Sequence, residues 1–314
     1  MNTCFRSFKK NTYLSVMADQ SALFIINKFA GGGFQPKVEG KILDICAKHN
    51  VECSIEFTRA RGHATTLAHE GVAKKFDRIV AVGGDGTVNE VARALVNTTH
   101  VMGIIPKGSG NGLSRHLGIP LAFERAVENV FIGKTLRMDT FTINNRLSLN
   151  VSGIGFDGHV ANLFGKDGKR GLVGYAKLTL KEFLSFKSFP FTISIDGTKQ
   201  NKSAFVVAIA NSSQYGNNAR IAPLASVTDE LLHLSLLKKV PAYMSIPFML
   251  KMFAGQVQRS SYCETLIGKN IIINTGEPQP FHVDGEPTGY DQQFIIHVQP
   301  LSLTLVVPQN TSAY

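Results

Sequence analysis

Two glycine-rich turns, each set between an apolar strand pattern and a helical pattern, constrain the fold of this chain more than any other feature. The first lies in VAVGGDGTVNEV, residues 80–91. The apolar run that ends at Val82 is typical of a short buried strand, and apolar residues recur at helical spacing from Val88 to Leu95. A turn of this kind leaves free N–H groups at the helix start and no Cβ to block a ligand. The pattern therefore predicts a phosphate-binding turn.

The residues of this first turn leave one alternative open. Asp-Gly between apolar runs is also typical of a β-hairpin, but the helical period after Thr87 favours a helix. Thr87 and Glu90 fit a capping box, which predicts that Thr87 is the N-cap and that Glu90 bonds back to it. Asp85 alone would repel phosphate. It fits beside a Mg²⁺ ion, because metal–phosphate sites in proteins use one or two carboxylates.

The second turn, PKGSGNG at residues 106–112, follows one strand–helix unit later. Ile104 and Ile105 precede it as a strand, and Leu113 and Leu117 lie one helical turn apart. Glycine-rich turns in successive units would lie side by side at the carboxyl edge of a parallel sheet. Neither turn matches the P-loop pattern or GxGxxG, which excludes an ordinary fingerprint of either kind.

The order of strand and helix patterns along the chain predicts two domains. Strand and helix patterns alternate up to about residue 139, which indicates a parallel sheet covered on both faces. From residue 140 strand patterns dominate, and only 173–187 and 241–253 read convincingly as helices. We therefore expect an α/β protein: an open parallel-sheet domain at residues 20–139 and a mainly antiparallel β domain at residues 140–299.

Composition narrows the class of protein. No apolar stretch approaches the roughly 18 residues that span a bilayer, and the first twenty residues lack the apolar core of a secretory signal. The four cysteines show no CxxC pair, which fits reduced thiols in a cytoplasmic protein. The net charge of +10 favours an anionic partner, but no nucleic-acid-binding module is recognisable, and the histidines form no zinc motif.

Several segments together resemble the diacylglycerol kinase catalytic domain family. This family of lipid kinases includes sphingosine kinases and bacterial diacylglycerol kinases, and it is distantly related to NAD kinases and phosphofructokinases. The resemblance extends over nearly the whole chain, although Lys28 stands where the family's first nucleotide loop has a proline. The segments that carry it are GGDGTVNEV, PKGSGNGLSRHLGIP, INKFAGGG (Ile26–Gly33), TRARGHATTLA (Thr58–Ala68), NVSGIGFDGHV (Asn150–Val160) and FHVDGEP (Phe281–Pro287).

The resemblance implies a two-domain kinase with the active site in the cleft between the domains. Its N-terminal domain would be similar to phosphofructokinase and NAD kinase, its C-terminal domain would be a β-sandwich, and the final strand, residues 300–314, would return to the first domain. ATP and Mg²⁺ are the implied cofactors. The nucleotide contacts that carry over are Asn27, Thr58, Gly84, Asp85, Gly86, Thr87, Gly108, Ser109 and Asn111.

The resemblance also implies an acidic catalytic pair, Asp284 and Glu286. Phosphoryl transfer to a hydroxyl needs neutralised phosphates, a hydroxyl held in line and a proton acceptor. Asp284 could be the base and Glu286 a metal or water ligand, while Asp85 is a rival for the base and the second candidate Mg²⁺ ligand. Taken alone, VDGEP would be an ordinary Asp-Gly turn.

Two further expectations concern the second domain. Many bacterial members bind a structural metal through a segment similar to DDGxLD, but this chain keeps only Asp229 and has Thr228, Glu230 and His233 nearby, so we expect that site to be lost or altered. A basic cluster suggests contact with anionic lipid headgroups, although a solvated helix face would explain it equally. Its members are Lys166, Lys169, Arg170, Lys177 and Lys181.

The predicted function is thus ATP-dependent phosphorylation of a lipid hydroxyl, with a diacylglycerol-like or sphingoid acceptor, by a cytoplasmic protein peripherally associated with the membrane. NAD kinase activity and a catalytically silent lipid- or nucleotide-binding protein are the alternatives. PKGSGNG and Val88-Asn89-Glu90 favour the lipid branch, and the presence of all three carboxylates argues against a silent protein. The acceptor and the oligomeric state stay open, a homodimer included.

Overall fold

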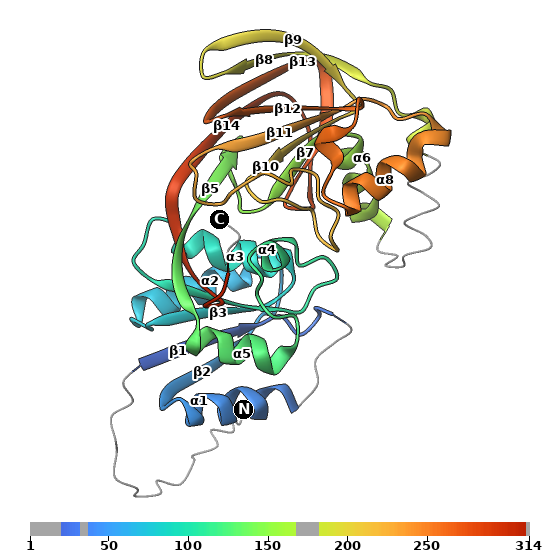
Figure 1. The fold of residues 1–314 in the computed structure, drawn as a ribbon. Helices are drawn as coiled ribbons and strands as arrows, with labels where there is room; N and C mark the ends of the chain where they lie inside the picture. The colour runs from blue at the N-terminus through green and yellow to red at the C-terminus, as the bar shows by residue number, and fades with distance from the viewer. Residues whose placement is uncertain (1–19, 32–36, 168–181, 312–314) are drawn as a thin grey trace, which may run out of the picture.

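The computed structural model describes residues 20–31, 37–167 and 182–311 (Figure 1). The N-terminal part alternates strands and helices. Its elements are β1 (Gln20–Ile26), α1 (Lys37–Lys48), β2 (Val51–Phe57), α2 (His63–Ala73), β3 (Arg78–Gly83), α3 (Asp85–Leu95), β4 (Val101–Pro106), α4 (Gly112–His116) and α5 (Phe123–Ile132). Strands β4, β3, β1 and β2 pair in that order, and every pair is parallel.

Helices cover both faces of this parallel sheet because β1, β3 and β4 are apolar on both sides, whereas the edge strand β2 carries exposed Glu52 and Glu56. Side chains of α2 and α3 pack on one face around Leu67 and Val91. Those of α1 and α5 pack on the other face around Ile42 and Val127. Strands β1, β3 and β4 are nearly continuous apolar runs, as expected for a sheet buried on both faces.

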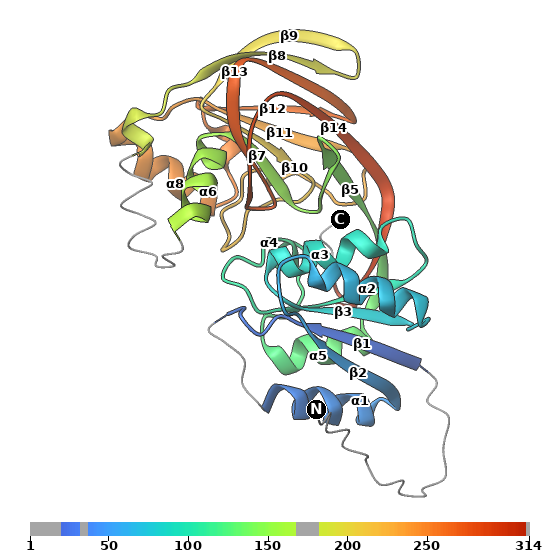
Figure 2. The same ribbon diagram turned by 180° about the vertical axis from the view of Figure 1, so that it is seen from behind.

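The C-terminal part is mainly antiparallel. Its elements are β5 (Lys134–Ile143), β6 (Arg146–Ser148), β7 (Val151–Gly155), α6 (Phe156–Asp167), β8 (Phe189–Ile195), β9 (Thr198–Ala204), β10 (Val206–Ala210), β11 (Leu232–Leu237), the 3₁₀ turns η1 (Ala242–Met244) and η2 (Val257–Arg259), α8 (Ser245–Phe253), β12 (Cys263–Gly268), β13 (Asn270–Val283) and β14 (Glu286–Val307). Its strands pack against each other around a second core that contains Phe141, Phe191 and Phe294. Figure 2 shows this part from behind, with α6 and α8 together at one side.

One strand joins the two parts. The first half of β14 pairs with β13, its second half pairs with β5, and Thr304 and Leu305 pair in parallel with β4. Leu301, with φ of 45°, lies at an irregularity within the pairing of β14 with β5, between Gln299 and Leu303. The structure therefore has one continuous hydrogen-bonded sheet, and β14 passes down the side of the molecule in both views (Figures 1 and 2).

The predicted fold class is confirmed: a parallel α/β part precedes an antiparallel β part. The hairpin alternative for the first glycine turn is wrong, because β3 and β4 are parallel and α3 separates them. The predicted helix at 241–253 corresponds to η1 and α8, whereas most of 173–187 lies outside the described residues. No helix in the described part of the chain is both long and apolar enough to cross a membrane.

Candidate active site

A pocket of ≈ 540 Å³ lies where the four parallel strands end. Each strand contributes a residue that follows its last position. Asn27 follows β1, Thr58 follows β2 and Gly84 follows β3, and Gly108 lies two residues after β4. The remaining lining residues are Phe29, Ala30, Gly31, Ala60, Arg61, Gly86, Thr87, Glu90, Ser109 and Glu286. The carboxyl ends of the strands thus form the pocket, the usual location of a ligand in an open α/β sheet.

The two glycine turns touch each other backbone to backbone. The N–H of Lys107 donates to the carbonyl of Gly83 at 2.7 Å. A Cβ on Gly108 would lie 2.7 Å from the Cα of Gly84, and a Cβ on Gly31 would lie 2.1 Å from the carbonyl oxygen of Lys107. Because any side chain at these positions would collide with backbone, the close packing of the turns requires glycine.

Helix α3 begins earlier than the capping-box pattern predicts. Its N-cap is Gly84, so Thr87 is already inside the helix, and the predicted capping role of Thr87 is wrong. The Thr87 hydroxyl instead accepts a hydrogen bond from Nδ2 of Asn27 at 3.0 Å. Glu90 accepts hydrogen bonds from the N–H groups of Gly62 and Ala64, at 2.8 and 3.2 Å. Its carboxylate therefore caps α2, a partner that only the tertiary fold brings within reach.

Asp85 connects the two turns from inside. Its carboxylate accepts the N–H of Asn111 and the N–H of Gly112, each at 2.9 Å. Burial, followed by the nearby negative charge of Asp284, raises the pKa of Asp85 to about 6, although the two backbone hydrogen bonds act in the opposite direction. Two of the roughly four acceptor positions of this carboxylate remain available. Asp85 is thus a partly buried carboxylate that titrates close to neutral pH.

Asn111 lies next to this carboxylate but does not line the pocket. Its side-chain amide closes the second turn, because Oδ1 accepts the N–H of Gly108 at 2.9 Å and Nδ2 donates to the carbonyl of Gly108 at 2.7 Å. Its φ of 50° is one that asparagine tolerates better than most residues. Asn111 therefore shapes the turn from within.

Asp284 lies in the two-residue hairpin turn between β13 and β14. Asp284 and Gly285 have φ of 49° and 83°, the positive values that a type I′ turn requires. Its carboxylate accepts four hydrogen bonds, which fill its acceptor positions. The donors are Ser148 Oγ at 2.6 Å, Asn89 Nδ2 at 2.8 Å, Leu149 N at 2.9 Å and Asn150 N at 3.0 Å. The turn therefore fastens α3 and the β6–β7 connection to the hairpin.

A histidine missed by the sequence reasoning supports the same hairpin. His282 Nδ1 accepts the N–H of Gly285 at 3.1 Å, so the proton is on Nε2, which donates to Asp157 Oδ2 at 3.2 Å. The hydroxyl of Tyr215 also donates to this oxygen, at 2.9 Å. Asp157 belongs to the NVSGIGFDGHV segment, and its link to the hairpin involves residues 125 positions apart in the chain. No local pattern could have indicated it.

Glu286 lines the pocket from the C-terminal part of the chain, and Glu90 of α3 also lines it. It forms an ion pair with Arg61, and its Oε1 would lie 2.6 Å from a Cβ on Gly86. Arg61 also lines the pocket, but the sequence reasoning did not single it out. The sequence does contain one signal for Arg61. It is a basic residue in a turn between a strand pattern and a helix pattern, and the two glycine turns predict that phosphate binds nearby.

The donor set fits a Mg²⁺ ion that is bound together with phosphate. No group of three or more His, Cys, Asp or Glu side chains in the described part of the chain could hold a metal by itself. Glu286 lines the pocket, whereas Asp85 has acceptor positions to spare but lies behind the lining, between Gly84 and Gly86. Mg²⁺ commonly keeps several waters and takes only one or two carboxylates plus substrate phosphates, so two carboxylates suffice.

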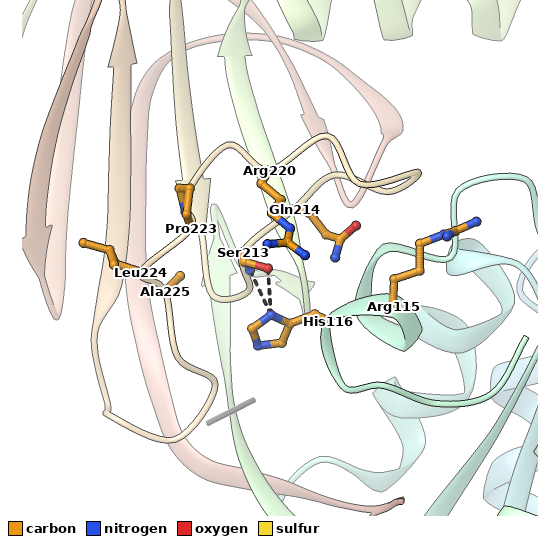
Figure 3. A pocket seen from close by; sticks show the side chains of 8 residues that line it. All are labelled: Arg115, His116, Ser213, Gln214, Arg220, Pro223, Leu224 and Ala225. Carbon is orange, nitrogen blue, oxygen red and sulfur yellow. Dashed lines mark hydrogen bonds between the residues drawn. The ribbon is translucent and has the colours of Figure 1, made fainter. Parts of the chain in front are cut away.

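A second pocket, of ≈ 280 Å³, is lined by none of the site residues predicted from the sequence (Figure 3). Arg115 and His116 of α4 line it with Ser213, Gln214, Arg220, Pro223, Leu224 and Ala225. The Nδ1 of His116 faces Ser213, and Figure 3 shows Arg115 extending away from the other side chains. Burial, and then the charge of Arg220, lowers the pKa of His116 to about 4, so its imidazole is neutral at physiological pH.

Comparison with known protein families defines the class to which this site belongs. Residues 21–143 match the sequence model of the diacylglycerol kinase catalytic domain. Residues 150–307 match the YegS C-terminal NAD kinase beta sandwich-like domain. The chain therefore belongs to the family that joins these two domains, it is a kinase, and the resemblance inferred from its motifs is confirmed.

Individual relatives agree with this assignment. The diacylglycerol kinase of Bacillus subtilis is 25% identical over 276 residues, which cover 85% of this chain and 90% of that protein. A "probable lipid kinase YegS-like" of Chromohalobacter salexigens is 24% identical over 265 residues, or 82% of this chain and 85% of that protein. The crystal structure of a candidate diacylglycerol kinase from Bacillus anthracis superposes with a TM-score of 0.77 and 26% identity, covering 93% of this chain and 98% of that one.

Proposed function

We propose that this kinase transfers the γ-phosphoryl group of ATP to a lipid hydroxyl, with a diacylglycerol-like or sphingoid acceptor. The observation that carries the proposal is the pocket in which two touching glycine turns, Arg61 and Glu286 converge at the ends of parallel strands. Bare backbone N–H groups at a helix start and an arginine are suited to phosphate oxygens. The names of the B. subtilis and C. salexigens relatives add support for a lipid acceptor.

The proposed site combines residues of both parts of the chain. The nucleotide domain would comprise residues 20–139 with the returning segment 300–314, and residues 140–299 would form the lipid domain. The pairing of β14 with β4 supports this division. Glu286, at the start of β14, lines the same pocket as the glycine turns, which supports a site between the two domains.

For nucleotide binding we propose the set predicted from the sequence, with different tasks for its members. Asn27, Thr58, Gly84, Gly86, Thr87, Gly108 and Ser109 line the pocket and would contact ATP. Asn111 would act indirectly, by holding the second turn in shape. Arg61 joins this set, since it could leave Glu286 for the phosphates when ATP binds.

For the chemical step we propose Asp85 as the proton acceptor. The acceptor hydroxyl oxygen attacks the γ-phosphorus, the bond to the β-phosphate oxygen breaks, ADP leaves, and the hydroxyl proton passes to the Asp85 carboxylate. The raised pKa of Asp85 supports this role, because a general base works best when its pKa lies near the operating pH. Asp284 would be a positioning residue, since four hydrogen bonds already occupy its carboxylate.

A Mg²⁺ ion would neutralise phosphate charge when it is bound with the nucleotide. Glu286 would hold it, and Asp85 is the second carboxylate proposed for it. The two proposed roles of Asp85 compete, because a carboxylate bound to a metal is a weaker base. Asp85→Asn separates them: loss of a metal ligand raises the Mg²⁺ concentration needed for half-maximal rate, whereas loss of a base lowers the rate at saturating Mg²⁺.

The site of action would be the cytoplasmic face of a membrane, where a lipid acceptor is found. The free thiols of Cys46, Cys53 and Cys263 are compatible with a reducing compartment. The basic cluster that suggested headgroup contact, Lys166 to Lys181, lies outside the residues whose side chains the structure describes. Peripheral association therefore needs support from another surface.

Turnover of labelled ATP against a panel of acceptors tests the proposed function. The panel contains diacylglycerol, a sphingoid base, phosphatidylglycerol, an undecaprenyl-type alcohol, NAD and a control without acceptor. We expect a labelled lipid product that requires Mg²⁺ and disappears with Asp85→Asn. A labelled product from NAD alone would instead identify an NAD kinase, and no product from any acceptor would favour a silent binding protein.

A further inference from the structure

The C-terminal part exposes an apolar helix face that packing inside the described residues does not explain. Helix α8 has no buried residue at all. Tyr243 of the preceding turn η1 is 80% exposed, and in the helix Ile246 and Leu250 are 71% and 64% exposed. Met249 and Phe253 are 48% and 45% exposed. A helix on the surface of a water-soluble domain normally turns such residues inward.

Helix geometry gathers these residues on one side. At about 100° per residue, Ile246, Met249, Leu250 and Phe253 fall within an arc of about 100°. Met252, which lies outside that arc, packs against the core cluster that contains Phe156 and Phe205. The helix thus has an inner contact and a separate, outward apolar face, and we call Tyr243, Ile246, Met249, Leu250 and Phe253 the α8 face.

Basic residues flank the α8 face and acidic residues are absent. The segment from Lys238 to Arg259 contains four basic residues and no Asp or Glu. Lys238, Lys251 and Arg259 are exposed, and none takes part in an ion pair within the described part of the chain. Lys239 has a different task, because its Nζ donates to the carbonyl of Phe186 at 2.7 Å.

The second pocket extends this basic, apolar surface. The backbone N–H of Arg220 donates to the carbonyl of Met252 at 3.2 Å, and its side chain passes close to Gly255 at the end of α8. Leu224, which lines the same pocket, is 68% exposed (Figure 3). Figures 1 and 2 both show α8 at the periphery beside α6, so no other described element covers its outer side.

We propose that the α8 face and its flanking basic residues dock the kinase on an anionic lipid bilayer. The inference rests on the proposed function, since a lipid acceptor resides in such a bilayer. Exposed Leu, Ile, Phe and Tyr side chains beside Lys and Arg are the combination that binds the interface of anionic membranes. A second copy of this chain is a poorer occupant, because a symmetric contact would bring the two sets of unpaired basic residues together.

Vesicle sedimentation with the full chain tests the docking surface directly. The vesicles consist of phosphatidylcholine alone or with about a third phosphatidylglycerol, which makes them anionic. We expect binding to the anionic vesicles only. Ile246→Ser/Leu250→Ser should weaken this binding at least about tenfold, because two large apolar side chains no longer enter the interface. The matched control, Leu43→Ser/Ile132→Ser, removes residues that are 49% and 58% exposed in the N-terminal part and should bind like the wild type.

A second pair of variants tests whether binding to anionic vesicles requires the basic residues beside the α8 face. Lys251→Gln should weaken binding to anionic vesicles about fivefold, and Lys199→Gln, an exposed lysine on β9, should leave it unchanged. The proposal would be overturned if the α8-face variants and their controls lost vesicle binding equally. It would also be overturned if the wild type bound neutral and anionic vesicles equally. An apparent mass of two chains in solution that falls to one chain in Ile246→Ser/Leu250→Ser would also overturn it, by identifying a second copy as the occupant.

Kinase assays test the docking surface separately from the proposed kinase activity. Ile246→Ser/Leu250→Ser should lose activity on an acceptor embedded in anionic vesicles but keep wild-type turnover on a short-chain acceptor dissolved in water. Equal loss on both acceptors would overturn the docking role. Specific binding of the wild type to anionic vesicles without phosphorylation of any lipid would uphold the docking surface and reject the proposed function.

Discussion

At the scale of single residues, the two aspartates that compete for the catalytic base differ in their hydrogen bonding. Asp284 accepts four hydrogen bonds, whereas Asp85 accepts two and has a pKa raised to about 6. A carboxylate must be ionised to accept a proton. The two residues should therefore give different experimental signatures.

The pH dependence of kcat/KM should report Asp85. Because the folded pKa is raised to about 6, Asp85 is protonated below that pH and ionised above it. Activity should therefore fall as the pH decreases through about 6, at a pH where an unperturbed aspartate would still be fully ionised. Asp85→Asn should lower turnover about 10²–10⁴-fold and abolish this acidic limb.

Asp284→Asn should behave differently. The amide keeps the shape of the turn but presents an N–H₂ group to donors, so the hairpin loses part of its attachment and turnover falls. The acidic limb should nevertheless remain, at lower amplitude and shifted to lower pH, because the lost charge of Asp284 no longer raises the pKa of Asp85. If Asp284→Asn removed the limb and Asp85→Asn kept it, the two roles would have to be exchanged. Circular dichroism of both variants checks that the fold is intact.

Gly84→Val should abolish nucleotide binding, because the larger side chain would crowd the backbone of the second turn at the wall of the pocket. A Cβ at Gly84 would lie 3.2 Å from the Cα of Gly108, tighter than ordinary contact, so the two turns would have to separate. Calorimetry should then detect no ATP binding at concentrations that saturate the wild type. Gly276→Val is the matched control, because no atom lies within 4 Å of a Cβ there. Unchanged ATP affinity in Gly84→Val would reject the phosphate-binding interpretation of the turns.

At the scale of elements, local patterns predicted what local interactions determine. The two strand–turn–helix units were predictable because glycine, apolar spacing and the following helix all lie within one short segment. The capping of α2 by Glu90 could not be predicted in this way, because its partners Gly62 and Ala64 lie at the start of another helix. The single strand β14 contains two strand-like runs, 293–299 and 301–307, which Pro300 separates in the sequence. It is continuous because different partners, β13 and then β5 with β4, support its two halves.

The same limit applies to the site. Residues in the glycine turns could be named from sequence because the turn itself creates their role. Arg61, His282 and Asp157 were missed because their roles depend on contacts with residues far along the chain. The edge strand β12, CETLIG, has a weak local strand pattern, because Glu264 and Thr265 are polar and its apolar run is short.

The segment around Asp229 should hold no tightly bound metal ion. His233 lies 3.9 Å from Asp229, and Glu230 forms an ion pair with Lys269 at 2.8 Å. Asp139 accepts the N–H of Glu230 at 2.7 Å. A lysine, a histidine and a backbone N–H group therefore already engage these carboxylates. Elemental analysis after dialysis should find less than one divalent ion per chain, and a stoichiometric ion that is lost in Asp229→Ala would show the expectation to be wrong.

At the scale of the whole molecule, the two parts share more than a connecting peptide. Strand β14 is hydrogen-bonded in both, and the core around α2 and α3 includes Leu149 and Val227 from the C-terminal part as well as Leu303 from β14. The Asp284 turn adds polar contacts to Asn89 of α3. Since backbone hydrogen bonds, apolar packing and side-chain contacts all cross the boundary, separation of the parts would expose buried surface on both sides.

The chain should therefore unfold as one cooperative unit, and ATP should stabilise all of it. Ligand that binds only the folded state adds a free energy of RT ln(1 + [L]/Kd), about 2.7 kcal/mol at 100 times Kd. In calorimetry we expect one transition that moves upward as a whole when ATP with Mg²⁺ is added. Hydrogen exchange should show the same slowing in β10 and β11, far along the sheet from the glycine turns, as in β3 and β4. Two transitions, of which ATP moves only one, would mean that the shared strand and core do not couple the parts. The Gly84→Val variant supplies the control, since its transition should not respond to ATP if binding is lost.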